Sequence, residues 1–374
     1  MKAVGIMTFH RSHNCGSILQ AYALQRVLLR RYEVKPECID FSSPGQQRLY
    51  TIFNGGMTIK GMLRNMGRVF IYHRLKENAK SYNKYIRRVI ATSPEEFHSQ
   101  TELHNAHFTY DMYITGSDQV WNIAIADYDP AYFLNFIDGT ARKIAYAASF
   151  GARRITEETD QPDTIGAMIH NIDAISVREP NGKAWLKEDF GIKSTVVLDP
   201  TLLLDSTDYA EAEESVDERP GKFIFVYATR VSKRFEQHIR ALADKEGLNI
   251  VIWQPDTWLK IGGFAKGYIL PKAENPGKYL WYMKHARYVF TASFHGVIFC
   301  TQYRKNFWIL RNDGMDYRRD DRILSLVDRL GISSRLLSED DAMELSTPTA
   351  YGEFEQKLVE QRAVSFRFLD RVMH

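Results

Sequence analysis

Cysteine is scarce in this sequence. Only three of its 374 residues are cysteines, and Cys15, Cys38 and Cys300 lie far apart with no C-x-x-C pair among them. Such spacing provides neither a disulfide framework nor a zinc site. It fits a reducing compartment, so we expect a cytoplasmic protein.

Long apolar runs are also missing. No stretch of about 18 consecutive apolar residues occurs, which argues against a membrane-spanning helix. The first eight residues contain a short apolar run without a small-residue cleavage site, so they predict a strand rather than a secretory signal. No low-complexity run interrupts the pattern, and we therefore expect the whole chain to fold.

Three kinds of binding signal are absent as well. Neither G-x-G-x-x-G nor G-x-x-x-x-G-K-[ST] follows a predicted strand, which removes the fingerprints of ordinary dinucleotide and P-loop sites. The formal net charge of +3 is too small by itself to indicate nucleic-acid binding, and we predict no nucleic-acid partner. No metal-ligand constellation is visible, so we expect neither a metal nor another cofactor.

What is present is a rhythm of short apolar runs alternating with helical segments, typical of parallel sheets with crossover helices. The clearest helix is 18–31, where apolar residues recur at helical spacing. The acidic segment 205–221 ends in Pro-Gly and predicts a domain boundary, after which the rhythm restarts. A chain of 374 residues also exceeds what one core normally supports.

We therefore predict an α/β fold with two Rossmann-like domains facing across a cleft, an architecture of the GT-B type. The first domain is expected at 1–205 as the acceptor side, and the second at 206–345 as the donor side. The remaining residues, 346–374, have helical spacing, and we expect this helix to pack back on the N-terminal domain.

Charge is uneven along the chain. Segment 60–88 holds nine basic residues and a single acid, Glu77, with apolar residues interleaved among them. A helix of this composition can lie on an anionic membrane surface, which would suit an enzyme whose acceptor is carried on a lipid. The alternative is a solvated helix with one face packed on the domain.

A histidine follows one of the predicted strands directly. The apolar run 288–290 leads through Thr291 to Ser293-Phe294-His295-Gly296 and then to another apolar segment. In open α/β sheets, ligands bind outside the carboxyl ends of the strands, where a following helix N-terminus favours anions. The position predicts an anion-handling enzyme, although a lone histidine here could equally be a cap or a satisfied buried residue.

Two loops in the first domain carry further polar residues at strand ends. Segment 14–20 (NCGSILQ) includes Gly16, which permits close backbone approach, and it leads into a helix whose N-terminus can receive a negative group. The alternative is a simple turn capped by Ser17. Segment 113–122 (YITGSDQVWN) places Asp118 after a strand, and here the alternative is helix capping.

An arginine, Arg178, leaves a third strand of the first domain. Its guanidinium can clamp a carboxylate or phosphate in two-pronged geometry, or it can pair with Glu179 or another acid. Tyr227 and Arg230 leave the first strand of the second domain. Both side chains can contact a ligand. The alternative is that the tyrosine packs in the core and the arginine is exposed to solvent.

In this order and spacing, the segments resemble the polysaccharide pyruvyl transferase family. The resemblance covers most of residues 1–335. It is carried by the N-x-G…LQ start, the GSDQVWN stretch, the ASFG of Ala148 to Gly151, the SVRE, the VLDPT of Val197 to Thr201, and the SFHG. It implies a GT-B-like fold and transfer of a pyruvyl group from phosphoenolpyruvate to sugar hydroxyls, forming a ketal on a surface polysaccharide, such as a capsule or exopolysaccharide, or on its lipid-linked precursor.

The resemblance also suggests roles for individual residues. His295 is expected to bind phosphate and act as general acid, Arg178 to help hold the phosphoenolpyruvate anion, and Asp118 to act as base for the sugar hydroxyl. The remaining candidates are expected to bind substrate: Asn14, Gly16, Ser117, Tyr227, Arg230, Ser293 and Gly296. Such an enzyme would work in the cytoplasm at the inner face of the membrane.

Two other functions fit the same architecture. A GT-B glycosyltransferase would use a nucleotide-sugar donor, and a non-catalytic glycan-binding relative would keep the fold without needing the polar set. Binding of phosphoenolpyruvate rather than a nucleoside diphosphate sugar would separate the first alternative from the pyruvyl transferase.

Overall fold

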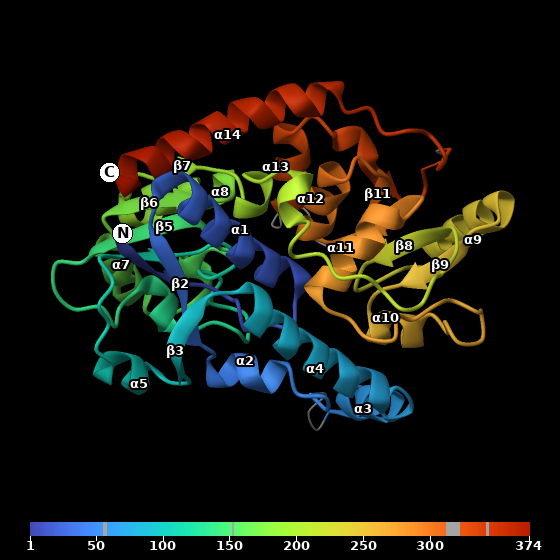
Figure 1. Cartoon of the computed structure of the whole chain (residues 1–374), viewed down its shortest axis with the longest axis horizontal. Helices are drawn as coiled ribbons and strands as arrows, with labels where there is room; N and C mark the ends of the chain where they lie inside the picture. Colours follow the sequence, from blue (N-terminus) through green and yellow to red (C-terminus); the bar gives the residue numbers. More distant parts are fainter. Residues whose placement is uncertain (55–57, 152, 312–321, 342–343) are drawn as a thin grey trace.

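The computed structural model describes residues 1–54, 58–151, 153–311, 322–341 and 344–374. Within these ranges two parallel sheets form the centres of two lobes (Figure 1). The first sheet has the order β3 (Thr92–Phe97), β2 (Lys35–Phe41), β1 (Ala3–Met7), β4 (Met112–Thr115), β5 (Arg142–Ala148), β6 (Ala174–Val177) and β7 (Thr195–Val196). The second has the order β12 (Leu336–Ser338), β11 (Asn306–Arg311), β10 (Tyr288–Thr291), β8 (Phe223–Tyr227) and β9 (Asn249–Ile252).

Parallel strands need long crossover connections, and α-helices form most of them; the connection from β4 to β5 has only a 3-10 turn. In the first lobe the helices are α1 (Cys15–Tyr32), α2 (Pro44–Leu49), α3 (Ile59–Phe70), α4 (Tyr72–Val89), α5 (Gln100–Asn105), α6 (Ile155–Glu158), α7 (Pro162–His170) and α8 (Pro180–Phe190). In the second they are α9 (Lys233–Glu246), α10 (Pro255–Lys260), α11 (Pro276–His285), α12 (Phe294–Gln302) and α13 (Arg322–Arg329). Short 3-10 turns lie at Pro130–Phe133, Pro200–Leu202, Ser206–Tyr209 and Ser333–Arg335.

The core follows from the alternation of side chains along each strand. In β1, Val4 and Ile6 face one apolar cluster and Met7 faces another on the opposite side of the sheet. The first cluster is continuous across both lobes, because α1 of the first lobe packs against α11 of the second. The two lobes therefore share an apolar contact in addition to the chain connection between them.

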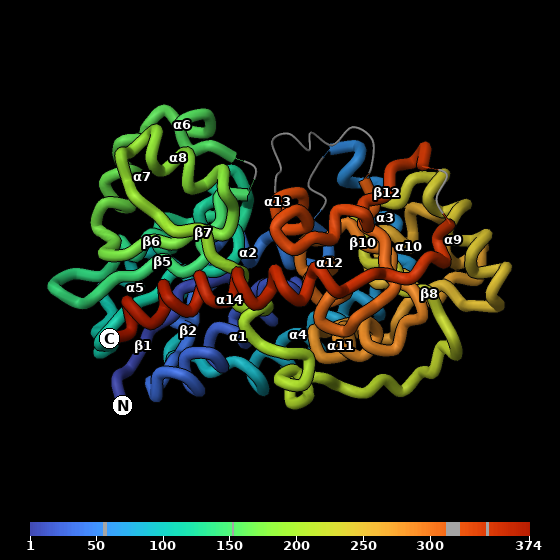
Figure 2. The backbone as a smooth tube through the Cα atoms, turned by 90° about the horizontal axis from the view of Figure 1, so that it is seen from above, coloured from blue at the N-terminus to red at the C-terminus, as the bar shows by residue number. Residues whose placement is uncertain are grey.

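The C-terminal helix α14 (Gly352–Met373) crosses from the second lobe to the first, and the two termini lie in the same lobe (Figures 1 and 2). Its Ser365 hydroxyl accepts a hydrogen bond from the Leu198 N–H at 2.9 Å. Its Asp370 accepts one from the Arg31 guanidinium at 3.0 Å. These contacts fasten the end of the chain to the N-terminal lobe.

The basic segment 60–88 forms two helices, because the chain bends at Ile71 between α3 and α4. Helix α4 packs on the lobe through Tyr82, Tyr85 and Ile86, as the packed-helix alternative anticipates. Helix α3 behaves differently. Its large apolar side chains are 51–88 % exposed: Ile59, Met62, Leu63, Met66, Val69 and Phe70.

Two local predictions need correction. The short run 268–270 of the second domain also has the pattern of a strand, and we predict one there from the sequence; in the structure it forms only an isolated bridge between Ile269 and Val251. Strand β3, with the sequence TSPEEF, was not expected, because an edge strand lacks the apolar run of a central one. Among the described helices, none has the length and apolar character needed to cross a bilayer.

Candidate functional site

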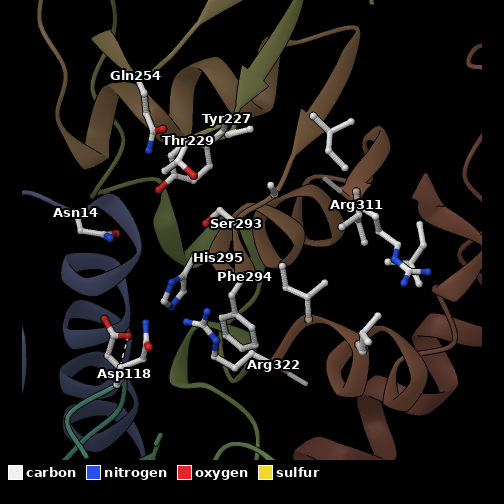
Figure 3. Close-up of a pocket in the computed structure, with 18 of the residues that line it drawn as sticks. Asn14, Asp118, Tyr227, Thr229, Gln254, Ser293, Phe294, His295, Arg311 and Arg322 are labelled. Atoms are coloured by element: carbon white, nitrogen blue, oxygen red, sulfur yellow. Dashed lines mark hydrogen bonds between the residues drawn. The ribbon is translucent and has the colours of Figure 1, made fainter. Parts of the chain in front are cut away.

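The carboxyl ends of both sheets meet at a cavity of about 220 Å³. The first lobe contributes Asn14, Asp118, Gln119 and Arg178 to its wall. The second lobe contributes residues that include Tyr227, Thr229, Gln254, Ser293, Phe294, His295, Arg311 and Arg322 (Figure 3). This is where ligands bind in open α/β sheets, so the cavity is the candidate active site.

His295 lies in the first turn of α12 and points toward the side of the cavity where Asp118 lies (Figure 3). Ser293 is the N-cap of this helix, and its hydroxyl accepts the Gly296 N–H at 3.3 Å. His295 is 7 % exposed, and its Nε2 makes no hydrogen bond in the described structure, although it lies at ion-pair distance, 3.5 Å, from Asp199 Oδ2. His295 is therefore neither a cap nor a fully satisfied core histidine.

Gly16 brings the first lobe against this imidazole. A Cβ added to Gly16 would lie 2.1 Å from Nδ1 of His295, so the contact requires a residue without a side chain. Asn14 caps α1, because its Oδ1 accepts the N–H groups of Gly16 at 2.9 Å and Ser17 at 3.4 Å. The alternative of a Ser17 cap is wrong, and the close approach predicted for Gly16 is made to His295.

Asp118 occupies a left-handed backbone conformation with φ of 75°, which is uncommon for a non-glycine residue. Its Oδ2 accepts the Ser17 hydroxyl at 2.5 Å, and its Oδ1 accepts the Gln119 N–H at 2.8 Å. The same Oδ1 is 3.9 Å from Nη1 of Arg178. No α-helix follows at residues 119–122, so the helix-capping alternative does not apply.

Arg178 is surrounded by acids and does not present an open fork to the cavity. Its Nε donates to Glu179 Oε1 at 2.6 Å and its Nη1 to Asp199 Oδ2 at 3.3 Å. Its guanidinium carbon lies 4.1 Å from the centre of the Phe294 ring. Burial alone would lower the pKa of Arg178, but the charges of Glu179, Asp199 and Asp118 raise it overall. The structure thus shows the pairing with acids that was one of the two alternatives for Arg178.

Asp199 is a central residue of the site that was not singled out from the sequence. Its Oδ2 lies 3.5 Å from His295 Nε2, and its Oδ1 accepts the Thr201 hydroxyl at 2.6 Å. Burial would raise the pKa of Asp199, but His295 and Arg178 together hold it well below the usual range. The signal that could have identified this residue is its place in the VLDPT segment, directly after a strand.

Four of the predicted residues do not line the cavity. Ser117 is fully buried beneath it, with its hydroxyl 3.0 Å from both Asp199 Oδ2 and Ala147 O. Gly296 lies inside the first turn of α12, where an added Cβ would be 2.1 Å from the Thr291 hydroxyl. Gly16 contacts His295 but is not part of the cavity lining. Arg230 is exposed to solvent, as in the alternative of an exposed arginine.

Two arginines of the second lobe line the cavity and were not predicted. Arg311 ends β11, the neighbour of β10, and Arg322 begins α13. An arginine directly after the apolar run 307–310 is the signal that could have found the first of them. Together with the N–H groups at the start of α12, they make the second-lobe side of the cavity suited to an anion.

The arrangement therefore combines an imidazole and a carboxylate from facing lobes with two guanidinium groups at one wall. Such a set can bind an anionic substrate and move protons to and from it. Within the described ranges, no three His, Cys, Asp or Glu side chains are grouped to hold a metal ion.

Comparisons with known proteins agree with this architecture. The model of the family "Polysaccharide pyruvyl transferase" matches residues 14–314. No curated protein matches the chain in sequence. Among solved structures, S. aureus MnaA with UDP aligns with a TM-score of 0.51 at 12 % identity, covering 100 % of this chain and 96 % of that one.

Two further solved structures show the same full-length alignment at lower scores. The Methanocaldococcus jannaschii UDP-GlcNAc 2-epimerase in complex with UDP-GlcNAc and UDP gives a TM-score of 0.47 at 11 % identity, with 98 % and 100 % coverage of the two chains. MurG of Acinetobacter baumannii gives 0.41 at 12 % identity, with 100 % and 97 % coverage.

The two α/β lobes and the likeness to MnaA confirm the predicted GT-B-like fold. The family match includes every predicted site residue, from Asn14 to Gly296. Because the matched region spans most of the 374 residues, the chain belongs to the polysaccharide pyruvyl transferase family.

Proposed function

We propose that this protein transfers a pyruvyl group from phosphoenolpyruvate to sugar hydroxyls of a surface polysaccharide or its lipid-linked precursor, forming a ketal. The observation that carries the proposal is one cavity in which His295 and Asp118 come from opposite lobes and two arginines line the wall. The family assignment supports a pyruvyl transferase; the donor and the ketal product are part of the proposal.

The charges around the cavity suggest how the donor would be oriented. Arg178 is paired with Glu179 and Asp199 within the first lobe. Arg311, Arg322 and the N-terminus of α12 lie on the second-lobe side, and we assign the phosphate and carboxylate of phosphoenolpyruvate to them. Arg178 would then act as a positioning residue for Asp118 and Asp199.

In this orientation His295 would protonate the methylene carbon of the donor, which leaves a cationic centre at the carbon that bears the phosphate oxygen. A sugar hydroxyl would attack that centre while Asp118 accepts its proton. Inorganic phosphate would depart, and a second hydroxyl would close the ketal ring. The proton of the second hydroxyl would restore the histidine, and the first would leave with phosphate, so the protons balance.

Donor identity is tested by thermal shift and phosphate release. We expect phosphoenolpyruvate, and not UDP-GlcNAc, to raise the melting temperature, because a ligand that binds only the folded state stabilises it. Phosphate release should further require a glycoside acceptor, for which a panel of p-nitrophenyl hexosides serves as probe. Arg311→Met should abolish the shift, whereas Arg234→Met, an exposed arginine of α9, should retain it.

The opposite pattern would contradict the proposal. A shift with UDP-GlcNAc and none with phosphoenolpyruvate would favour the glycosyltransferase alternative. If phosphoenolpyruvate raised the melting temperature of Arg311→Met and Arg234→Met equally, the proposed binding of the donor to Arg311 would be wrong.

We also propose that α3 rests on an anionic membrane surface, where a lipid-linked acceptor would be found. Its exposed apolar side chains recur at positions 59, 62, 63, 66, 69 and 70, which is one face of a helix. On the other side, Arg68 pairs with Asp256 of α10 at 2.6 Å and holds the helix to the protein. Nine basic residues against one acid in 60–88 give the charge that complements anionic lipid.

The membrane contact is tested by sedimentation with vesicles. We expect binding to phosphatidylglycerol-containing vesicles and much weaker binding to pure phosphatidylcholine. The double variant Met66→Gln, Phe70→Gln should bind at least about tenfold more weakly, because each inserted apolar side chain contributes about 1.5–3 kcal/mol. Val359→Gln, which changes an apolar residue of α14 that is about as exposed as Met66, is the matched control. Equal binding of the double variant and the control would refute the contact.

A further inference from the structure

A second cavity, of about 180 Å³, lies beside the first one between the lobes. Its wall includes His13, Tyr50, Asn78, Tyr82 and Glu274. The two cavities lie near each other: His13 and Pro255 line this one, and their chain neighbours Asn14 and Gln254 line the other. Helix α3 reaches the wall through Arg68, so this cavity lies between the exposed face of α3 and the candidate active site.

Glu274 is the unusual residue of the second cavity. Its side chain is 6 % exposed, and its Oε1 is buried without a hydrogen-bond partner in the described structure. A buried polar oxygen without a partner costs free energy, so such a group calls for an explanation. Burial, and then the nearby charge of Asp256, raises the pKa of Glu274 well above its usual range. Its carboxyl group can therefore donate as well as accept a hydrogen bond.

The charged groups of this cavity disfavour an anionic ligand. The Arg68 guanidinium is hydrogen-bonded within the protein. Its Nε and Nη2 donate to Asp256 at 2.9 and 2.6 Å, and its Nη1 donates to Asn54 Oδ1 at 2.7 Å. Burial lowers the pKa of His13, which favours the uncharged imidazole. A dianion such as phosphoenolpyruvate would meet a carboxyl group here and no uncompensated cation among the described lining residues.

The remaining walls combine aromatic faces with polar groups. The His13 ring stacks on Tyr82 with ring centres 5.2 Å apart, and it lies 5.2 Å from the Tyr50 ring. Aromatic faces next to a few convergent hydrogen-bonding groups are typical of a site for a neutral ligand with both apolar and polar surfaces. A sugar ring has this character, with C–H groups on its faces and hydroxyls at its edge.

We infer that the second cavity binds a neutral hexose ring of the acceptor, with its face against the aromatic rings of His13 and Tyr50 and a hydroxyl hydrogen-bonded to Glu274. That the bound sugar belongs to the acceptor rests on the proposed function, whereas the binding of a sugar does not. A glycan on a lipid at α3 would pass this cavity before its hydroxyls reach His295.

The test is saturation-transfer difference NMR with the methyl glycosides of glucose, galactose and mannose as probes. We expect at least one of them to bind the wild-type protein. Ala79→Phe, which fills the cavity from α4, should abolish the signal, and its control Ala79→Ser should keep it. Glu274→Gln should weaken binding at least tenfold, while the thermal shift caused by phosphoenolpyruvate remains unchanged in all three variants.

Loss of fold is controlled by melting each variant. The raised pKa of Glu274 means that the wild-type protein loses stability as pH rises above the unfolded-state pKa, and glutamine removes that loss. Glu274→Gln should therefore melt no lower than wild type at neutral pH. Wild-type protein that binds none of the glycosides, or binding that Ala79→Phe and Glu274→Gln leave intact, would overturn the inference. Glycoside binding without a phosphoenolpyruvate shift would instead overturn the proposed donor alone.

Discussion

Replacement of His295 by glutamine is expected to lower kcat for phosphoenolpyruvate-dependent phosphate release by roughly 10²- to 10⁴-fold, the usual contribution of a general acid. The protein should still bind the donor, because Arg311 and Arg322 are unchanged, so the thermal shift with phosphoenolpyruvate should persist. His285→Gln, an exposed histidine of α11, provides the matched control and should keep full turnover.

The pair of measurements separates catalysis from binding. Normal turnover in His295→Gln would remove the histidine from the proton-transfer step. Loss of the thermal shift together with turnover would make its main role the binding of phosphate.

Replacement of Arg178 by methionine is expected to lower the free energy of unfolding by about 3–5 kcal/mol at pH 7, the typical cost of breaking a buried ion pair. Asp118, Glu179 and Asp199 would then face one another without their shared cation. The measurement is urea unfolding at pH 7 and pH 5, with the exposed Arg287→Met as control.

The loss of stability in Arg178→Met is expected to depend on pH. In the wild-type protein the lowered pKa of Asp199 contributes stability above its unfolded-state pKa, and that stability is lost only in strong acid. Without Arg178 the remaining carboxylates repel one another and favour protonation, so the deficit of the variant should be smaller at pH 5 than at pH 7. If Arg178→Met had wild-type stability but did not bind phosphoenolpyruvate, Arg178 would instead be a residue that binds the donor anion directly.

The fold class and the family could be predicted from the sequence because they depend on local patterns. Helix 18–31 is found as the body of α1, and the apolar run 288–290 lies within β10. The polar residues at strand ends were informative for the same reason, since parallel strands bring their carboxyl ends to one edge. Asn14, Asp118, Tyr227, Ser293 and His295 all reach the cavity wall.

The sequence could not predict which interaction partner each of these side chains has, because the partners come together only in the folded protein. Whether Arg178 clamps an anion or pairs with acids depends on Asp199, which is distant in sequence and joins it only in the folded lobe. The unpartnered oxygen of Glu274 depends on contacts between both lobes. The exposure of the apolar face of α3 depends on which side of that helix the rest of the protein covers, and periodicity alone does not distinguish the two faces.

The contact between Gly16 and His295 joins the two lobes at the cavity, so the proposed proton transfers depend on how the lobes are positioned. The imidazole belongs to one lobe and Asp118 to the other, so a hinge rotation that parted the lobes would also part the proton source from the proton sink. A donor bound to one lobe alone would meet only half of the proposed proton relay. The reaction that we propose would therefore need both walls of the cavity at once.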